Sequence, residues 1–226
     1  MATVVITGAA RGIGLALAAQ HVAAGDRVLA LPRKASAELE ALAASSGGLL
    51  TIHLCDVASD ASVRSAAAGS GDAPVDVLYN VAGVSGPVAN ELETADWDAW
   101  NETFAIMVQG PLRVLQAFLP RMGEGSRVIN VTSQLGASTW PMGGFYAYAA
   151  AKAGLNRLTR SLAIDLKPRG VILGVVHPGW VQTQLGGPHA QISPEESAAG
   201  LRKLAAEWSL EDSGDFRKWN GEPHDW

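Results

Sequence analysis

Short apolar runs alternate with longer segments of helical periodicity along the chain. Runs rich in β-branched residues predict strands at residues 3–7, 27–31, 49–54, 75–79, 127–131 and 171–176, with a short one near 215–218. The segments between them predict helices at residues 13–24, 35–45, 59–68, 96–122, 146–166 and 193–208. We expect the long helix at 96–122 to kink near Gly110 and Pro111.

This repetition of strand and helix predicts a parallel sheet. Several of the strand segments are apolar throughout, which is typical of strands covered on both faces. Repeated β-α-β units then predict an α/β fold of the Rossmann type, a doubly wound parallel sheet in three α/β/α layers. The chain contains no linker or internal repeat, so we expect residues 1–226 to form a single domain.

Charge and composition exclude several classes of function. The net charge is −5 and no basic stripe is present, which argues against nucleic acid as a partner. No run of about 18 apolar residues predicts a membrane span, and no secretion signal is recognisable, so we expect a cytoplasmic protein. Cys55, the only cysteine, ends an apolar run and is expected to be a buried core thiol. The histidines show no metal-ligand spacing, so we predict no metal site.

A glycine-rich turn follows the first predicted strand and leads into a helix. Gly8, Gly12 and Gly14 would let the backbone turn tightly and let a pyrophosphate approach the helix N-terminus, where free N–H groups favour anions. A glycine triplet alone is a weak signal, but its position between a strand and a helix is the required context. We therefore predict a dinucleotide site, with a turn that binds no ligand as the alternative.

The end of the second predicted strand bears on the choice of dinucleotide. An acidic residue at this point would bind the 2′-hydroxyl of the adenosine ribose, whereas an arginine accommodates a 2′-phosphate. The sequence has Arg33 and Lys34 there and no acid, and Arg11 adds a cation in the glycine-rich turn. This pattern favours NADP(H) over NAD(H), although two adjacent charges are also common in a solvated loop.

Tyr148 and Lys152 are four residues apart and would share one face of a helix. An ammonium group near a phenol favours the phenolate, so we expect a lowered pKa for Tyr148 and a role in proton transfer. Ser133 follows the fifth predicted strand, at the edge of the sheet where folds of this type bind ligands, and its hydroxyl could bind a carbonyl oxygen.

Together, these motifs resemble the short-chain dehydrogenase/reductase family over essentially the whole chain, and the C-factor and Sniffer-like carbonyl reductases within it. The resemblance includes Tyr146, Asn156 and the ending Gly-Glu-Pro-His-Asp-Trp. It implies that Ser133, Tyr148 and Lys152 are catalytic and that Tyr148 and Lys152 also contact the cofactor. It further implies cofactor contacts from the glycine-rich turn and from the ends of the third, fourth and sixth predicted strands: Gly8, Gly12, Ile13, Gly14, Asp56, Val57, Asn80, Ala82, Gly83, Pro178, Gly179, Val181 and Thr183. The charge argument above adds Arg11 in the turn and Arg33 after the second strand to this set.

The family mechanism implies hydride transfer between the dinucleotide and a carbonyl carbon, while the tyrosine protonates the oxygen, the serine steadies it and the lysine assists the tyrosine. Tyr148 is favoured over Tyr146 because only Tyr148 has a lysine four residues later. Tyr146 is then either a pocket residue or a packing residue. The aromatic and apolar residues Trp140, Met142, Phe145, Trp180 and Leu185 follow the active-site strands, and they line a pocket for a small apolar aldehyde or ketone or pack within loops.

One position departs from the family pattern. Met107 stands where the family has an asparagine in its central helix, and a thioether cannot hold a water as an amide does. This departure, with the resemblance to C-factor proteins, supports an alternative function as a dinucleotide-binding signalling protein with little catalysis. The resemblance also favours a homodimer, because the two long helices at 96–122 and 146–166 form a dimer surface in many relatives, although some members of this subgroup are monomers.

Overall fold

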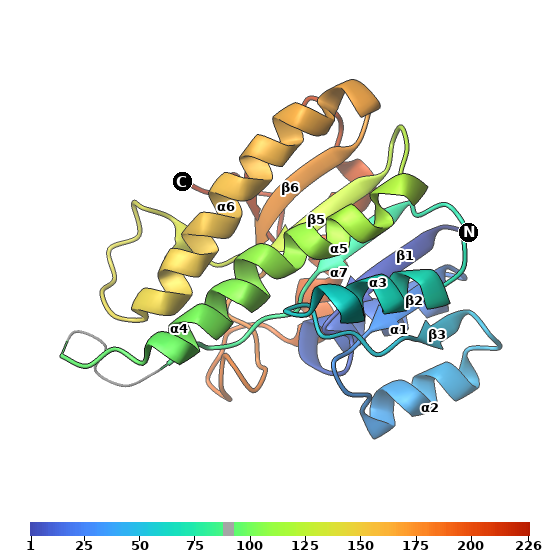
Figure 1. Ribbon diagram of the computed structural model, residues 1–226, viewed down its shortest axis with the longest axis horizontal. Helices are drawn as coiled ribbons and strands as arrows, with labels where there is room; N and C mark the ends of the chain where they lie inside the picture. The colour runs from blue at the N-terminus through green and yellow to red at the C-terminus, as the bar shows by residue number, and fades with distance from the viewer. Residues whose placement is uncertain (88–92) are drawn as a thin grey trace.

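A parallel β-sheet forms the centre of the computed structural model, which describes residues 1–87 and 93–226 (Figure 1). In the described residues the sheet has seven strands in the order β3-β2-β1-β4-β5-β6-β7, and each pair of neighbours is parallel. This order is that of a Rossmann-type doubly wound fold, as predicted. The strands are β1 (Thr3–Thr7), β2 (Arg27–Leu31), β3 (Leu50–Ile52), β4 (Val77–Asn80), β5 (Arg127–Val131), β6 (Ile172–His177) and β7 (Phe216–Lys218).

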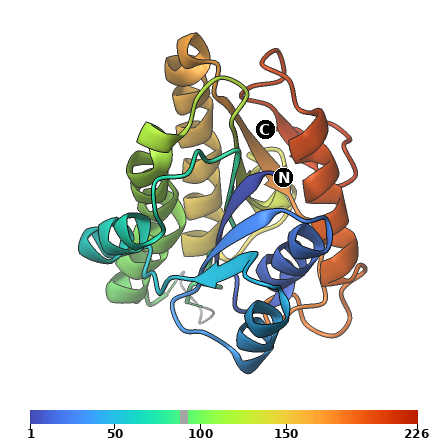
Figure 2. The same ribbon diagram turned by 90° about the vertical axis from the view of Figure 1, so that its right-hand side faces the viewer.

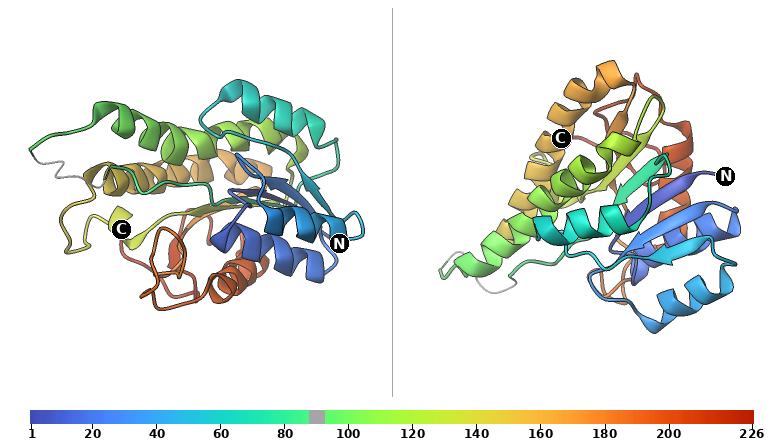
Figure 3. Two further views of the ribbon diagram at one scale, coloured as in Figure 1. Left: turned by 90° about the horizontal axis from the view of Figure 1, so that it is seen from below. Right: turned by 45° about the vertical axis from the view of Figure 1, so that its right-hand side comes forward.

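Helices cover both faces of the sheet, which gives the three predicted layers (Figures 2 and 3). One core lies between the sheet and α1, α2 and α7, and a second lies between the sheet and α3, α5 and α6. Because the central strands are apolar on both faces, each face needs its own covering layer. The helices are α1 (Gly12–Ala23), α2 (Ala37–Ser45), α3 (Asp60–Gly69), α4 (Trp97–Phe104), α5 (Gly110–Phe118), α6 (Tyr146–Leu166) and α7 (Pro194–Glu207), with 3₁₀ turns at Leu119–Arg121, Gln134–Gly136 and Lys167–Arg169.

Side-chain caps begin several of the helices. The side chains of Ser36, Ser59, Asp96 and Ser193 each accept a hydrogen bond from a backbone N–H in the first turn of the helix that follows. Each cap satisfies a donor that the helix itself leaves free. Pro194 follows its cap at the first helical position, where the missing N–H costs nothing.

The predicted long helix at 96–122 is interrupted. A π-helical turn at Ala105–Gln109 separates α4 from α5, so the break lies immediately before the predicted kink at Gly110. Pro111 has no N–H to give the carbonyl four residues earlier, which belongs to Met107. The backbone therefore leaves the α-helical pattern around Met107, which is part of the candidate site.

Candidate active site

A tight cradle forms where β1 runs into α1. Gly8 has a φ of +66°, and a Cβ on Gly8 would lie 2.9 Å from the backbone of Ala82. A Cβ on Gly14 would lie only 2.4 Å from the carbonyl oxygen of Gly8. The N-cap residue of α1, Arg11, makes no side-chain cap, so the first-turn N–H groups of the helix face outward without a side-chain acceptor. The cradle thus fits a dinucleotide pyrophosphate, which needs close backbone approach and free helical N–H groups.

Thr7 joins the cradle to the end of β4. Its hydroxyl accepts hydrogen bonds from the backbone N–H groups of Val81, at 3.0 Å, and Ala82, at 3.1 Å. The structure therefore brings the Asn80–Gly83 segment against the glycine-rich turn, as expected for two parts of one cofactor site. Sequence reasoning missed Thr7, although a threonine at the last position of the strand before the turn was an available signal.

The other predicted cofactor residues surround the same edge of the sheet. A Cβ on Gly12 would lie 3.0 Å from Cγ2 of Thr183, so the segment after β6 crosses the glycine-rich turn. Arg11 hydrogen-bonds Gln184 on that segment. Asp56 accepts a hydrogen bond from Ala58 N–H at 2.9 Å, and Val57 packs against Gly110.

Arg33 is exposed at the end of β2, and its side chain makes no ion pair within the described part of the chain. The following loop is anchored by Ser36, whose hydroxyl donates to the carbonyl of Ala10 at 2.7 Å. Ser36 therefore holds the end of β2 next to the glycine-rich turn. Sequence reasoning did not single out Ser36.

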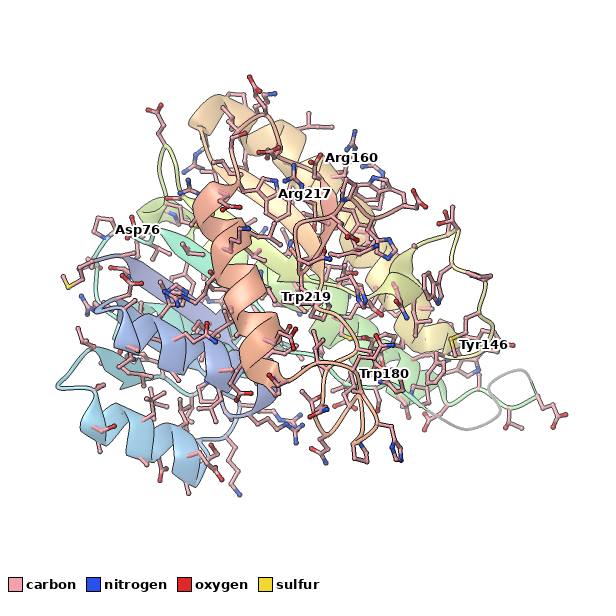
Figure 4. All side chains as sticks on the ribbon, turned by 180° about the vertical axis from the view of Figure 1, so that it is seen from behind. Asp76, Tyr146, Arg160, Trp180, Arg217 and Trp219 are labelled. Atoms are coloured by element: carbon pink, nitrogen blue, oxygen red, sulfur yellow. The ribbon has the colours of Figure 1, made fainter. Side chains whose placement is uncertain are left out.

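The three predicted catalytic side chains meet between β5 and α6. Tyr148 and Ser133 are joined by a side-chain hydrogen bond, and the Nζ of Lys152 lies 5.7 Å from the centre of the Tyr148 ring. Lys152 is 5 % exposed and donates to the carbonyl of Val131 at 2.8 Å. Tyr146, by contrast, is 39 % exposed at the first position of α6 (Figure 4). The structure thus brings Tyr148, and not Tyr146, to Ser133.

Burial controls the ionisation of Lys152 and Tyr148. Burial lowers the pKa of Lys152 to about 8, because the ammonium loses its hydration. Burial also raises the pKa of Tyr148, and the hydrogen bond with Ser133 only partly offsets this rise. The expectation of a lowered pKa for Tyr148 was wrong, because the sequence gives the charge of the lysine but not the depth at which the phenol lies. Tyr148 is therefore protonated at neutral pH and suited to donate a proton.

A network of hydrogen bonds between buried amides and hydroxyls lies beside Ser133, Tyr148 and Lys152. Asn80 donates to Asn130, and Asn130 donates to Thr159, both at 2.8 Å, which ties β4 and β5 to α6. Thr132 donates to Asn156 at 2.6 Å, and Asn156 donates to the carbonyl of Gly136 at 3.1 Å. Because buried polar groups need partners, these contacts hold Ser133 and Lys152 on a fixed frame. Of these residues, the sequence singled out only Asn80 and Asn156, and only through the family resemblance.

Met107 lies in the π-helical turn and is 1 % exposed. A Cβ on Gly83 would lie 3.6 Å from the sulfur of Met107 and 4.0 Å from Nζ of Lys152. The thioether and the Lys152 ammonium therefore both lie near Gly83, and the thioether also belongs to the core under α5. Met107 is thus a core residue that also faces the candidate site from the position where the family has an asparagine.

The wall of the site after β6 is built by the C-terminal segment. Nδ1 of His177 accepts a hydrogen bond from the backbone N–H of Gln134 at 3.3 Å, and the ring of His224 packs edge-on against His177 with the centroids 5.7 Å apart. Burial, with a smaller effect of the charges of His224 and Lys218, lowers the pKa of His177 to about 4. His177 is therefore neutral, and its free Nδ1 lone pair positions the residue after Ser133.

All five predicted apolar pocket residues are exposed on the loops after β5 and β6. Trp180 is 47 % exposed, and it lies at the same end of the molecule as Tyr146, opposite Asp76 at the amino end of β4 (Figure 4). The others are Trp140, Met142, Phe145 and Leu185. Exposed aromatic side chains at the carboxyl end of a parallel sheet suit the binding of an apolar molecule.

The remaining predictions concern single residues and absences. Cys55 is buried, as predicted, and burial raises its pKa to about 11, so it is an inert thiol. Among residues 1–87 and 93–226, no group of three or more metal-ligating side chains comes together. No helix of the described chain has the length and apolar character that crossing a bilayer requires.

A glycine cradle at the carboxyl end of a doubly wound sheet defines the class of dinucleotide-binding α/β proteins, and the comparisons identify the family. The family model for short chain dehydrogenases matches residues 2–192. The C-signal protein of Myxococcus xanthus is 42 % identical over 156 residues, which are 68 % of this chain and 93 % of that protein.

Two solved structures extend the likeness to the whole fold. An NADPH-bound carbonyl reductase from chicken fatty liver superposes with a TM-score of 0.89 at 30 % identity, over 99 % of this chain and 98 % of that one. The carbonyl reductase Sniffer of D. melanogaster gives a TM-score of 0.91 at 26 % identity, with both chains covered completely. The chain belongs to the short-chain dehydrogenase/reductase family and is an NAD(P)-dependent oxidoreductase, with the predicted likeness to C-factor and carbonyl reductases confirmed.

Proposed function

We propose that the protein interconverts a small, largely apolar aldehyde or ketone and its alcohol, with NADP(H) as the cofactor and Tyr148 as the acid and base. The observation that carries the proposal is the hydrogen-bonded Tyr148–Ser133 pair with Lys152 beside it. A bound nicotinamide dinucleotide supplies or accepts the hydride at the carbonyl carbon. The protein residues then have to place the carbonyl oxygen and manage one proton.

Each of the three side chains has a separate task in this proposal. Tyr148, protonated because burial raises its pKa, donates a proton to the carbonyl oxygen as charge develops on it. The Ser133 hydroxyl, held by its bond with Tyr148, stabilises the same oxygen. Lys152 is anchored on Val131 and would contact the nicotinamide ribose while its charge favours the tyrosinate left after proton transfer.

The preference for NADP(H) rests on the end of β2. Arg33 is exposed and free to reach a 2′-phosphate, and no acidic side chain stands there to bind a 2′-hydroxyl. Arg11 is a second cation at the glycine-rich turn, although it already contacts Gln184. The chicken carbonyl reductase was solved with NADPH, which is consistent with this choice.

The predicted preference for an apolar substrate rests on the exposed side chains around the site, which form its apolar rim. Trp140, Phe145 and Trp180 leave 39 %, 40 % and 47 % of their surfaces exposed, respectively, so an apolar substrate would gain from covering them. Three further statements remain predictions: the protein acts in the cytoplasm, it folds as a single domain, and it assembles as a homodimer. Trp97 on α4, 68 % exposed, is a candidate contact for the second subunit.

The test is turnover of an aldehyde and ketone panel by the purified protein, followed by the absorbance of NADPH. Tyr148→Phe should lower kcat by about 10² to 10⁴ because the proton donor is lost, while NADPH still binds with its usual affinity. Tyr146→Phe is the matched control and should stay near the wild-type rate, since Tyr146 is exposed and belongs to the rim. Undiminished turnover by Tyr148→Phe would refute the assignment.

A second candidate function is signalling through dinucleotide binding with little catalysis. The likeness to the C-signal protein favours it, as does Met107 at the position where the family has an asparagine. This alternative predicts NADPH binding without oxidation over the whole panel. Met107→Asn separates the two functions, because a large gain in rate would mean that the missing amide limits chemistry in an otherwise competent site.

A further inference from the structure

A hollow of about 370 Å³ lies outside the candidate active site, against the outward face of α6. It is bounded by the loop after β5, by α6 and by Trp226, with the lining residues Gly136, Ser138, Ala153, Asn156, Arg157, Arg160, Ile164 and Trp226. Ala153, Arg157, Arg160 and Ile164 follow one another at helical spacing on the exposed face of α6, whereas Lys152 is buried and donates to Val131 on β5. None of Ser133, Tyr148 and Lys152 lines the hollow, although Asn156 of the supporting frame does.

Two arginine side chains line this hollow in a chain whose net charge is −5. Within the described residues, the ion pairs include neither Arg157 nor Arg160. Arg157 donates to Ser161 at 2.8 Å, and Arg160 donates to the carbonyl of Gly214 at 3.3 Å. A guanidinium has five N–H donors, so both side chains keep donors for an anion.

Trp226 provides a fixed aromatic wall. Its main-chain oxygen accepts hydrogen bonds from Ser138, at 2.9 Å, and from Thr139, at 3.3 Å. Its ring packs edge-on against Phe216 with the centroids 5.7 Å apart, and the guanidinium of Arg160 lies 5.5 Å from the ring centre. Figure 4 shows Arg160 on the side of the molecule where Arg217 of β7 also lies. The wall is thus organised before any ligand binds, which reduces the entropic cost of binding.

The apolar part of the lining complements these charges. Ile164 is 66 % exposed and Trp226 is 39 % exposed, so both retain apolar surface that a flat ring could cover. The volume lies within the range of small-molecule sites, which are mainly apolar with a few placed polar groups. Paired guanidinium groups match a carboxylate, because their forked donors can bind both of its oxygens.

We propose that this hollow binds a small aromatic carboxylate, with the carboxylate on Arg157 and Arg160 and the ring between Trp226 and Ile164. The inference does not depend on the proposed reductase activity. A bound ligand would contact Gly136 and Ser138, on the loop that begins at Ser133.

The test is an NMR titration of the ¹⁵N-labelled full chain with 2-naphthoate as the probe. We expect saturable shifts of the backbone signals of Gly136 and Ser138 and of the Trp226 indole N–H, with a dissociation constant on the order of 1 mM or tighter. The double variant Arg157→Gln plus Arg160→Gln should weaken binding at least about tenfold. Tyr148→Phe, which alters only the candidate active site, should bind the probe like the wild type.

Three further measurements test whether the shifts come from the proposed binding. The neutral analogue 2-naphthamide should bind at least about tenfold more weakly than 2-naphthoate, since it lacks the charge. Equal binding of the two probes, or shifts confined to the active site, would overturn the proposal, as would equal shifts with inorganic phosphate alone. Sedimentation tests whether a second copy of the chain occupies the hollow instead. A dimer that Ile164→Asp dissociates would mean that a second copy covers this face, and this result would also overturn the proposal.

Discussion

The ammonium of Lys152 donates a hydrogen bond to the carbonyl of Val131 at 2.8 Å, while the lysine side chain is almost fully buried. Val131 is the last residue of β5, and Ser133 follows two positions later. One strand end therefore both holds the lysine and presents the serine. Because the carbonyl compensates only part of the lost hydration, the charged form of Lys152 remains costly, and its pKa falls to about 8.

This low pKa predicts a pH-dependent affinity for NADPH. The Lys152 ammonium is present below about pH 8 and is lost as the pH rises through that value, so its proposed contact with the ribose is expected to weaken in alkaline solution. We expect the dissociation constant for NADPH to rise about tenfold between pH 7 and pH 9, measured by fluorescence titration. Tyr148→Phe should show the same rise, which assigns it to the lysine. An affinity that stays constant over this range would contradict the prediction.

The choice of cofactor is predicted to depend on Arg33. Arg33→Ala should weaken NADPH binding by about 10- to 100-fold, the value of a charge-assisted bond to phosphate, and leave NADH binding unchanged. Lys34→Ala is the control, since it removes the neighbouring charge and should have a much smaller effect. If both variants lose NADPH affinity equally, general attraction of anions explains the preference and Arg33 has no specific role.

Steric crowding in the cradle predicts a sharp difference between two glycines. Gly14→Ala places a Cβ 2.4 Å from the carbonyl oxygen of Gly8, so the turn has to shift. We expect a stability loss of about 1–3 kcal/mol in urea unfolding and at least about tenfold weaker dinucleotide binding. Gly123→Ala is the matched control, because a Cβ there meets no atom within 4 Å. Equal behaviour of the two variants would mean that the cradle is not tight.

Acid should destabilise the protein through His177. Its pKa is about 4 in the folded protein, against 6.5 for an unperturbed histidine, so the unfolded state binds the proton more tightly. The neutral His177 therefore contributes to the free energy of unfolding in full above pH 6.5. This contribution is lost as the pH falls toward 4, and the loss is about 3 kcal/mol.

His177→Asn keeps an acceptor for the Gln134 N–H but cannot titrate, so its unfolding free energy should fall about 3 kcal/mol less than that of the wild type between pH 7 and pH 4. His189→Asn, at an exposed position, should retain the wild-type dependence. Urea unfolding across this range measures all three proteins. Parallel curves for the wild type and His177→Asn would disprove the assignment.

The pattern of apolar residues along the chain was sufficient to predict the architecture. Strand runs such as residues 3–7 and 127–131 match the observed β1 and β5, because central strands covered on both faces need uninterrupted apolar residues. The spacing of Tyr148 and Lys152 also placed both on α6, since helical geometry is local. The interruption before Gly110 was expected within a few residues because proline acts on its own neighbours.

Contacts between distant segments were decided only by the tertiary structure. The raised pKa of Tyr148 depends on burial, and the bonds from Thr7 to Val81 and Ala82 join residues more than seventy positions apart. The hollow beside Arg160 exists because Trp226 lies against α6 and bonds to Ser138. By itself, the sequence determined the helices, the strands and the family motifs, since these depend on near neighbours. Desolvation and long-range hydrogen bonds depend on how the chain packs. Only the tertiary structure could therefore decide the ionisation of the site residues and which segments enclose the site.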